Sequence, residues 1–481
     1  MRLLYIPFFS NKKNHNGCSI YNTMKVFFRT LVDLDENIFI YFLLPDNLPY
    51  NNEKILDHPR IKKIKVPSIG RDQYDEKVLI PSEKLYELFN EDIGKYYYDI
   101  VICDKAQITN YLKLVLDRKY LYNSTQSTVY ITLTQFITKQ EGRFKNITDD
   151  TEFSHCIGWL SGFNMFENKR NANICFDIAK KYLQPAYTKK IINSSYLGNV
   201  YGLNTKVLDN YYKGNNYKQG DKIKINFANR AASHYKLDEI LKVVNYIFKS
   251  GLWIKFIITT PNTNIGSYAS KIIKEMKKAG LDLELYTGLK QSEFYEKASE
   301  CHIFISYIDE LQSPNSFMEQ MYLGQIGLFS KSSWVDYFFP KYPNKFDSFI
   351  EVFTLIKSFS KDPKKMIEMN QAYRQKLKEN YDIQKNTKTF LSWLNEKIKP
   401  EILKTVTENQ LYMIKDILEK AGNPKSFTYD EYKKIIRNNT KLKIDLSFPA
   451  FGRMNKFDYI KTLYKLGYKD TCEQELKFKK I

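Results

Sequence analysis

The chain contains 481 residues, 43% of them hydrophobic and 27% charged, which indicates a globular protein with more than one hydrophobic core. Its 74 Lys and Arg against 54 Asp and Glu give a formal net charge of +20. This charge favours a polyanionic partner (nucleic acid, an anionic membrane surface or another anionic polymer), although an AT-rich coding sequence would also enrich lysine. No apolar stretch is long enough for a membrane-spanning helix, and the N-terminus lacks a secretory signal, so we expect a cytoplasmic protein.

The cysteines and histidines indicate neither disulfides nor a metal site. None of the 6 cysteines forms a C-x-x-C pair and the 5 histidines are scattered, so we expect reduced core cysteines and no bound metal. The Asp33-Leu34-Asp35 sequence has the spacing of a D-x-D metal motif. It follows a predicted helix instead of a strand, and we interpret it as a solvated turn.

Short apolar runs alternate with helical patterns in the first part of the chain. Helices are expected at 20–32 and 83–89, and strands at 3–9, 38–44, 61–66, 100–103, 129–133 and 155–160. Strands that alternate with helices are typical of βαβ units in a parallel sheet.

A polar, turn-rich stretch at 191–222 separates these elements from a second βα series. In that series, the helix after Lys236 places Leu237, Ile240 and Val244 on one face, and Gly251 ends it. The predicted strands are 224–228, 253–259, 283–286, 302–307 and 326–330, and the predicted helices are 264–279, 292–299, 315–323, 363–380 and 383–398.

The sequence therefore predicts an α/β protein with two Rossmann-like, doubly wound domains that face each other across a cleft. The expected divisions are an N-terminal domain (1–190), a linker (191–222), a second domain (223–382), a crossover helix (383–399) and a basic helical appendage (400–481). Helices are expected in the appendage near 411–421, 429–437 and 456–466. The appendage is either a packing cap with a basic face or an arm that binds nucleic acid.

The first candidate binding residues lie at 223–236. A β-rich run ends at Arg230, a loop follows, and Lys236 stands just before the next helix. Two cations beside a helix N-terminus form a site suited to a diphosphate. Gly17 follows the first strand of the other domain, where a glycine would let the backbone approach a phosphate or an acceptor.

This segment and two later ones resemble the nucleotide-sugar-binding half of GT-B glycosyltransferases, especially the large retaining family of sucrose and glycogen synthase-like enzymes (glycosyltransferase family 4-like). The shared elements are Arg230 with Lys236 six residues later, then Gly288, Ser292, Tyr295 and Ala298, and finally Glu319, Met321 and Gly324. The departures are Asn229 in place of a glycine, Gly327 in place of a proline, and Leu311, next to Glu310, in place of a first glutamate.

The resemblance implies a hexosyltransferase that uses a nucleotide sugar such as UDP-glucose, requires no cofactor and retains the anomeric configuration. Its catalytic residues would be Arg230, Lys236 and Glu319. The donor would be bound by these three together with Gly17, Gly288, Ser292, Asn315, Ser316 and Phe317. Glu319 would accept hydrogen bonds from ribose hydroxyls, and N–H groups around Asn315 to Phe317 would cap a phosphate.

The acceptor is inferred from the overall charge and from a similarity to the phage α-glucosyltransferases that modify hydroxymethylated cytosine in DNA. We therefore expect double-stranded DNA as a partner, in the host-cell cytoplasm if the chain is phage-encoded. The candidate acceptor-binding residues are Lys12, Lys13, Gln135, Lys139, Arg143 and Lys145. Two alternatives remain open. One is an envelope glycosyltransferase acting on a polysaccharide, teichoic acid or glycolipid, and the other is a non-catalytic nucleic-acid-binding protein.

A general base is not visible in the first domain. The family often places a His or Asp after a later strand of this domain, but the comparable loop at 132–145 contains Gln135 and no histidine. Front-face transfer needs no such base, because the leaving diphosphate can take the acceptor proton itself.

Overall fold

The computed structural model describes residues 1–7, 9–10, 19–45, 54–66, 77–78, 98–104, 129–134, 149–160, 162–229, 236–260, 265–309 and 314–400. In the C-terminal tail it describes residues 415, 418–419, 421–428, 431, 434–435, 463, 468–470 and 477–480.

A parallel seven-stranded sheet forms the first unit, in the order β4-β3-β1-β6-β7-β8-β9. Its strands are β1 (Arg2–Ile6), β3 (Phe39–Pro45), β4 (Ile61–Val66), β6 (Ile100–Cys103), β7 (Val129–Thr134), β8 (Phe163–Phe166) and β9 (Ser195–Tyr196). The helices are α1 (Ser19–Leu34), α4 (Asp149–Leu160), α5 (Lys169–Tyr182) and α6 (Pro185–Asn193), and Lys54–Leu56 form a short 3-10 turn. A separate antiparallel pair joins β2 (Phe9–Ser10) to β5 (Lys77–Val78).

A parallel six-stranded sheet forms the second unit, in the order β12-β11-β10-β13-β14-β15. Its strands are β10 (Ile223–Ala228), β11 (Ile254–Thr260), β12 (Asp282–Thr287), β13 (Ile303–Ser306), β14 (Ile326–Ser330) and β15 (Lys345–Phe346). The helices are α8 (Leu237–Lys249), α9 (Ser267–Lys278), α10 (Gln291–Ser299), α11 (Asn315–Tyr322), α12 (Ser333–Phe338), α13 (Phe349–Lys361) and α14 (Pro363–Tyr381). The strand order is that of a doubly wound nucleotide-binding sheet.

The chain crosses between the two units twice, and the two crossings are hydrogen-bonded to each other. The first crossing precedes α7 (Thr205–Asp209), and the second joins α14 to α15 (Ile383–Trp393). The Leu203 N–H donates to the Tyr381 carbonyl at 2.6 Å, and the Ile383 N–H donates to the Leu203 carbonyl at 3.0 Å. A side chain at Gly202 would approach the Tyr381 carbonyl oxygen to 2.7 Å, so a glycine allows this contact.

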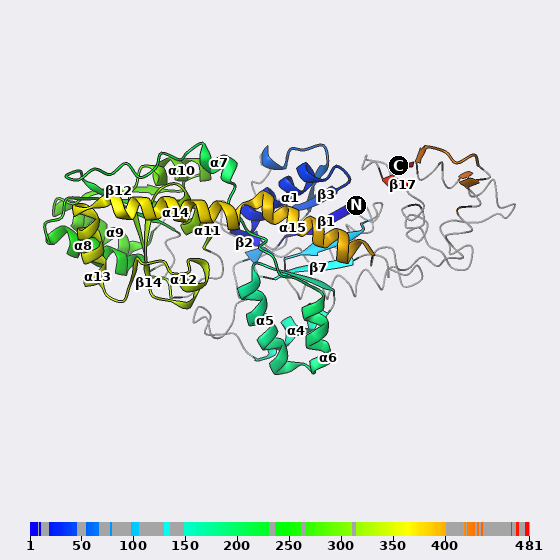
Figure 1. The fold of residues 1–481 in the computed structure, drawn as a ribbon, viewed down its shortest axis with the longest axis horizontal. Helices are drawn as coiled ribbons and strands as arrows, with labels where there is room; N and C mark the ends of the chain where they lie inside the picture. Colours follow the sequence, from blue (N-terminus) through cyan, green and yellow to red (C-terminus); the bar gives the residue numbers. More distant parts are fainter. Residues whose placement is uncertain are drawn as a thin grey trace.

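The helix α15 returns to the first unit and packs on α1. Phe390 of α15 contacts Phe27 of α1 and Tyr196 of β9, with ring centroids 5.1 and 5.3 Å apart. Figure 1 shows α14 running along the second unit and α15 continuing beside α1. A five-residue π-helix, Leu394–Ile398, extends α15, and its two end residues are buried in the same core.

The predicted α/β architecture with two parallel sheets is confirmed, and each strand predicted between 224 and 330 corresponds to a strand of the second sheet. The strand predicted at 155–160 is wrong, because these residues end α4. Cys156 and Trp159 of α4 pack in a core with Phe166 and Phe176. A short apolar run cannot by itself separate a buried helical turn from a strand. The helix predicted at 83–89 lies outside the described residues.

Two further expectations about organisation differ from the structure. Part of the predicted linker belongs to the first unit, since α6 ends at Asn193 and β9 joins the first sheet. The tail was expected to be helical, and residues 415, 418–419, 431, 434–435 and 463 are helical, but the described part also contains an antiparallel sheet that was not predicted. Its strands are β16 (Ser426–Thr428), β18 (Lys477–Lys480) and β17 (Tyr468–Asp470). Most of the three predicted tail helices lies outside the described residues.

The described cysteines, Cys103, Cys156, Cys175 and Cys301, are all buried. Within the described ranges, none of the helices combines the length and the apolar character needed to cross a membrane.

Candidate functional site

The strand order of the second sheet places a crevice between β10 and β13. From β10 the sheet extends one way through β11 and β12, and the other way through β13 and β14. The helices that follow these strands, α8 and α11, therefore lie on opposite faces, and such a switch point is where parallel sheets bind ligands. Asn229 and Lys236 follow β10, Asp309 follows β13, and α11 begins shortly after it. Arg230 lies outside the described residues.

Lys236 lies at the N-cap of α8 and forms an ion pair across the switch point. Its Nζ donates to Asp309 Oδ2 at 2.5 Å. The Lys236 backbone has φ 50° and ψ 45°, a left-handed conformation that costs a residue with a Cβ about 1–2 kcal/mol. Backbone strain of this kind is concentrated at ligand-binding positions. The fold therefore holds Lys236 in a strained backbone conformation beside Asp309. An anion bound there would compete with Asp309 for the lysine ammonium group.

The start of α11 is connected to the end of β10 by side-chain hydrogen bonds. Ser316 Oγ donates to Asn229 Oδ1 at 3.1 Å, and Asn226 Nδ2 in β10 donates to Gln320 Oε1 at 3.3 Å. These bonds fix the positive end of the helix dipole beside the carboxyl end of the strand. The Phe317 N–H donates to the Pro314 carbonyl at 3.0 Å, and the Phe317 side chain is buried between Phe304 and Trp334. Phe317 therefore anchors the helix, and Asn315 and Ser316 are the outermost residues at its start.

Glu319, one helical turn after Asn315, is a partly buried carboxylate. Its Oε1 accepts a hydrogen bond of 2.7 Å from the Tyr295 hydroxyl, which in turn accepts one of 2.6 Å from Gln291 Nε2. Burial raises the pKa of the Glu319 carboxyl to about 7, although the hydrogen bonds from Tyr295 and Gln291 lower it. Burial and the adjacent Glu319 raise the pKa of Tyr295 well above its usual range, so this phenol remains a donor.

The chemistry of Glu319 suits the recognition of hydroxyl groups. One of its two oxygens, Oε1, is fixed by the Tyr295 hydroxyl. A carboxylate with one oxygen fixed by Tyr295 presents the other in a defined direction to a ligand hydroxyl.

Three other predicted residues lie around α10 and α11 in different roles. Gly288 follows β12 with φ +69°, a conformation that suits glycine. Ser292 is exposed in the first turn of α10, whose N-terminus is instead capped by Glu293, which accepts the Lys290 N–H at 2.8 Å. Gly324 ends α11 with φ +111°, and a Cβ there would lie 2.8 Å from the Gly214 carbonyl carbon. Gly324 therefore allows the connection between the two units to pack closely against α11.

The remaining predicted site residues lie outside the described part of the chain. These are Gly17, Arg230 and the whole acceptor set of Lys12, Lys13, Gln135, Lys139, Arg143 and Lys145.

Two carboxylates at strand ends were missed by the sequence analysis. Asp309 follows β13 and pairs with Lys236, and Asp104 follows β6 at the switch point of the first sheet. Asp104 Oδ2 accepts a hydrogen bond of 2.8 Å from Tyr5 of β1, which packs on Phe28 and Phe42. An acidic residue directly after a predicted parallel strand was the signal available for both.

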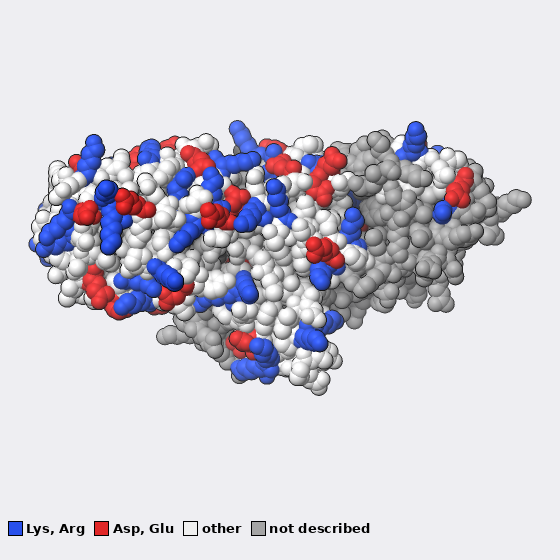
Figure 2. Space-filling model, in the orientation of Figure 1, with Lys and Arg blue, Asp and Glu red and all other residues white. Residues whose placement is uncertain are grey.

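The described acidic residues form no candidate metal site, and the face of the molecule in Figure 2 carries charges of both signs. No group of three His, Cys, Asp or Glu side chains there has the arrangement of a metal site. Asp33 pairs with Arg29 at 3.1 Å, and Asp35 accepts from Asn37, so the D-x-D motif spans the end of α1 and the surface turn that follows it. On the face drawn in Figure 2, the Lys and Arg side chains are interspersed with Asp and Glu.

Comparisons with known proteins match the fold but no sequence family. No family model matches the chain, and no curated protein matches its sequence. A glycosyltransferase from Rickettsia africae ESF-5 superimposes with a TM-score of 0.59 and 12% identity, covering 84% of this chain and 98% of that one. Sucrose-phosphate synthase from Thermosynechococcus elongatus gives a TM-score of 0.58 and 10% identity over 82% and 98% of the two chains. Anabaena HepE, in a complex with UDP-glucose, gives 0.56 and 8% over 82% and 99%.

The elevated pKa of Glu319 predicts a pH-dependent cost to stability. The folded-state pKa of about 7 exceeds the ordinary glutamate value of 4.5, so the stabilisation of the protonated form is lost as pH rises from about 4.5 through 7. Glu319→Gln keeps an acceptor for Tyr295 and cannot ionise. We expect it to raise the free energy of unfolding, relative to the parent, by about 1 kcal/mol more at pH 8 than at pH 5, after discounting for partial exposure.

Thermal or urea unfolding at the two pH values measures this difference. Glu296→Gln removes an exposed glutamate from α10 and is the matched control. An equal effect of Glu319→Gln at pH 5 and pH 8 would show that burial does not perturb this carboxyl.

The site residues Lys236, the start of α11 and Glu319 lie at the switch point of the second sheet. The chain has the GT-B fold, with two Rossmann-like units as in the glycosyltransferases above.

Proposed function

We propose that the protein is a glycosyltransferase that takes a hexose, glucose in the first instance, from a nucleotide-sugar donor such as UDP-glucose. The observation that carries the proposal is the set of three groups at the β10–β13 switch point: Lys236, the N-terminus of α11 and the partly buried Glu319. A similar fold with UDP-glucose bound is that of Anabaena HepE, which supports a nucleotide sugar as the ligand of this crevice.

Each group suits one part of the donor. Lys236, together with Arg230 of the preceding loop, would neutralise the diphosphate. The start of α11, at Asn315 and Ser316, would add its helix dipole and N–H groups to the same phosphates. Glu319 would accept hydrogen bonds from the ribose hydroxyls through Oε2. Cations and helix dipoles can stabilise the developing charge of the leaving diphosphate, so we propose transfer without a metal cofactor.

The proposed reaction retains the configuration at the sugar carbon. The bond from C1 to the diphosphate oxygen breaks, and a bond from C1 to the acceptor oxygen forms on the same face of the ring. The acceptor proton passes to the departing diphosphate oxygen, which acts as the base. Lys236 and Arg230 would stabilise the negative charge on the diphosphate until that proton arrives.

Asp309 is the counterion of Lys236 at the proposed donor site. The Asp309 carboxylate is exposed and pairs with Lys236, whose Nζ would otherwise face the crevice alone. A diphosphate must replace this carboxylate as the partner of Lys236, because both bind the same ammonium group. Asp309 therefore opposes binding of the diphosphate to a modest degree, since an exposed pair is worth at most about 1 kcal/mol.

The acceptor is the finer part of the proposal. The net charge of +20 favours a polyanion, and a hydroxymethylated base in double-stranded DNA is the polyanionic acceptor that we propose. The alternative acceptor is an envelope polysaccharide, teichoic acid or glycolipid. All acceptor-side residues from the sequence analysis lie outside the described part of the chain, so an acceptor assay has to decide between the two.

Opposite substitutions in the Lys236–Asp309 pair should change UDP affinity in opposite directions. Lys236→Ala should weaken UDP binding about tenfold or more, because a charge-assisted hydrogen bond to phosphate is lost. Asp309→Asn should strengthen it up to about fivefold, because it frees Lys236 and removes a negative charge beside the diphosphate. Calorimetric titration with UDP measures both. Weaker UDP binding in Asp309→Asn would refute the counterion role.

The transferase activity is tested by incubating the protein with radiolabelled UDP-glucose and four acceptors: hydroxymethylated DNA, unmodified DNA, lipid vesicles and an envelope polysaccharide. We expect label on the hydroxymethylated DNA, and we expect Lys236→Ala to abolish it. Lys249→Ala, at the far end of α8, is the matched control and should transfer normally. Label on lipid or polysaccharide would select the envelope alternative, and label on no acceptor would overturn the proposed function.

A further inference from the structure

A second candidate site lies at the amino ends of strands β8 and β9 in the first sheet. The switch point of this sheet lies at the carboxyl ends of its strands. The candidate site is a cavity of about 490 Å³ whose lining includes Phe163 at the start of β8 and Ser194 directly before β9. These residues mark the amino ends of the parallel strands, whereas the crevice between two such units opens at the carboxyl ends. The cavity is therefore separate from the proposed donor site.

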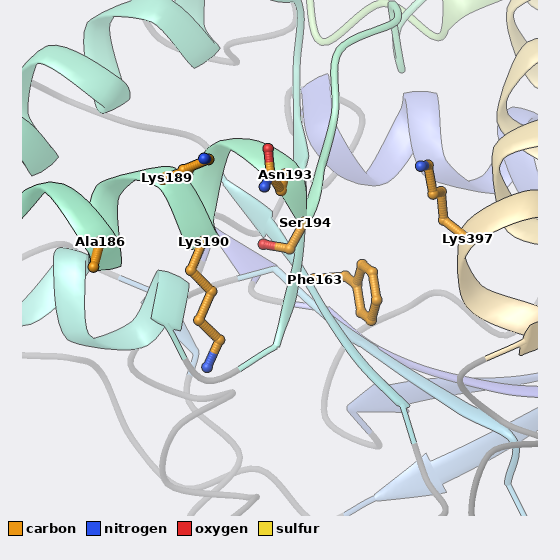
Figure 3. Close-up of a pocket in the computed structure, with 7 residues that line it drawn as sticks. All are labelled: Phe163, Ala186, Lys189, Lys190, Asn193, Ser194 and Lys397. Carbon is orange, nitrogen blue, oxygen red and sulfur yellow. The ribbon is translucent and has the colours of Figure 1, made fainter.

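Three lysines surround this cavity. Lys189 and Lys190 come from α6, and Lys397 comes from the π-helix after α15. Figure 3 shows the two α6 lysines on one side and Lys397 on the other, with Phe163 and Ser194 between them. Among the described residues, no carboxylate lines the cavity and none of the three lysines has an ion-pair partner. Three unpaired ammonium groups around one hollow favour an anionic ligand.

The position of Lys397 depends on an unusual piece of backbone. π-Helical turns are rare and are frequent at functional sites. In this one, Leu394 and Ile398 are both buried in the core of the first unit, which anchors the widened turn. Lys397, between them, is exposed and faces the cavity. Core packing therefore fixes the backbone of this turn, and the turn places the Lys397 side chain at the rim of the cavity.

The floor of the cavity combines an aromatic ring with hydrogen-bonding groups. Phe163 packs edge-on against Trp393 with ring centroids 5.9 Å apart, which holds its ring in place. Ser194 Oγ donates to the Ile191 carbonyl at 3.1 Å and accepts from Asn164 Nδ2 at 3.4 Å. The Asn193 side chain is exposed at the rim. An aromatic ring beside hydroxyl and amide groups suits a sugar ring, which has an apolar face and hydroxyl edges.

We propose that this cavity binds a sugar that carries a phosphate or carboxylate group. The anionic group lies among Lys189, Lys190 and Lys397, and the ring lies against Phe163 with its hydroxyls near Asn193 and Ser194. The volume is within the range of small-ligand sites. The ligand is either a free sugar phosphate or the end of an acidic glycan, because the recognised chemistry is the same. This site is independent of the donor site and of whether transfer occurs.

Calorimetric titration of the full chain tests the proposal with five probes: glucose 6-phosphate, trigalacturonate, glucose, inorganic phosphate and a short DNA duplex. We expect one of the two anionic sugars to bind more tightly than glucose or phosphate alone. Tighter binding of glucose 6-phosphate identifies a free sugar phosphate, and tighter binding of trigalacturonate identifies an acidic glycan. No binding of either anionic sugar, or tighter binding of the duplex, overturns the proposal.

Substitutions distinguish the contribution of the lysine charges to binding from that of the Phe163 ring. The double variant Lys190→Gln/Lys397→Gln should weaken the anionic sugar at least about tenfold, since two charge-assisted contacts are lost. Lys388→Gln, an exposed lysine of α15 away from the cavity, is the matched control and should bind normally. Phe163→Leu preserves apolar packing and should weaken the anionic sugar but not inorganic phosphate. An unchanged affinity in the double variant, with an unchanged melting temperature, refutes this site.

Discussion

The parallel pairing of β10 with both β11 and β13 is the constraint on which the rest of the second unit depends. Ile225 pairs with Phe256 on one side and with Ile303 on the other, so the loops after β10 and β13 leave the sheet at one edge and diverge. The crevice between them is a consequence of connectivity and needs no special residue. The sequence supplies the charged residues at this switch point, Lys236 after β10 and Asp309 after β13.

The described crevice is arranged around charges that an unliganded protein must balance. Lys236 is paired with an exposed aspartate that a bound diphosphate would have to replace, and Glu319 is partly buried with a raised pKa. Residues held in this way are typical of binding sites, where stability is lost in return for a prepared geometry. The lysine-lined cavity of the first unit has the same character, since its cations have no counterions among the described residues.

Sequence periodicity predicted the second unit closely because its strands are short apolar runs bounded by amphipathic helices. The first unit was less predictable from the sequence. Its strands β8 and β9 have four and two residues, too few to show a hydrophobic period, and the apolar end of α4 resembles a strand. Lys236 and Glu319 were identified from a family pattern. Their pairings with Asp309 and Tyr295 were not predicted, because Asp309 is 73 residues from Lys236, and Tyr295, although part of the same pattern, is 24 from Glu319. Only the fold brings these side chains together.

The central claim is that a nucleotide sugar binds at the β10–β13 switch point. Amide hydrogen exchange with and without UDP-glucose tests it most directly, because backbone N–H groups and helix starts contact the diphosphate in the account above. The account predicts slower exchange at the loop before α8 and at the first turn of α11, with unchanged exchange around the lysine-lined cavity. Unchanged exchange in both the α8 loop and the α11 turn at saturating UDP-glucose, or protection confined to the first unit, would contradict it.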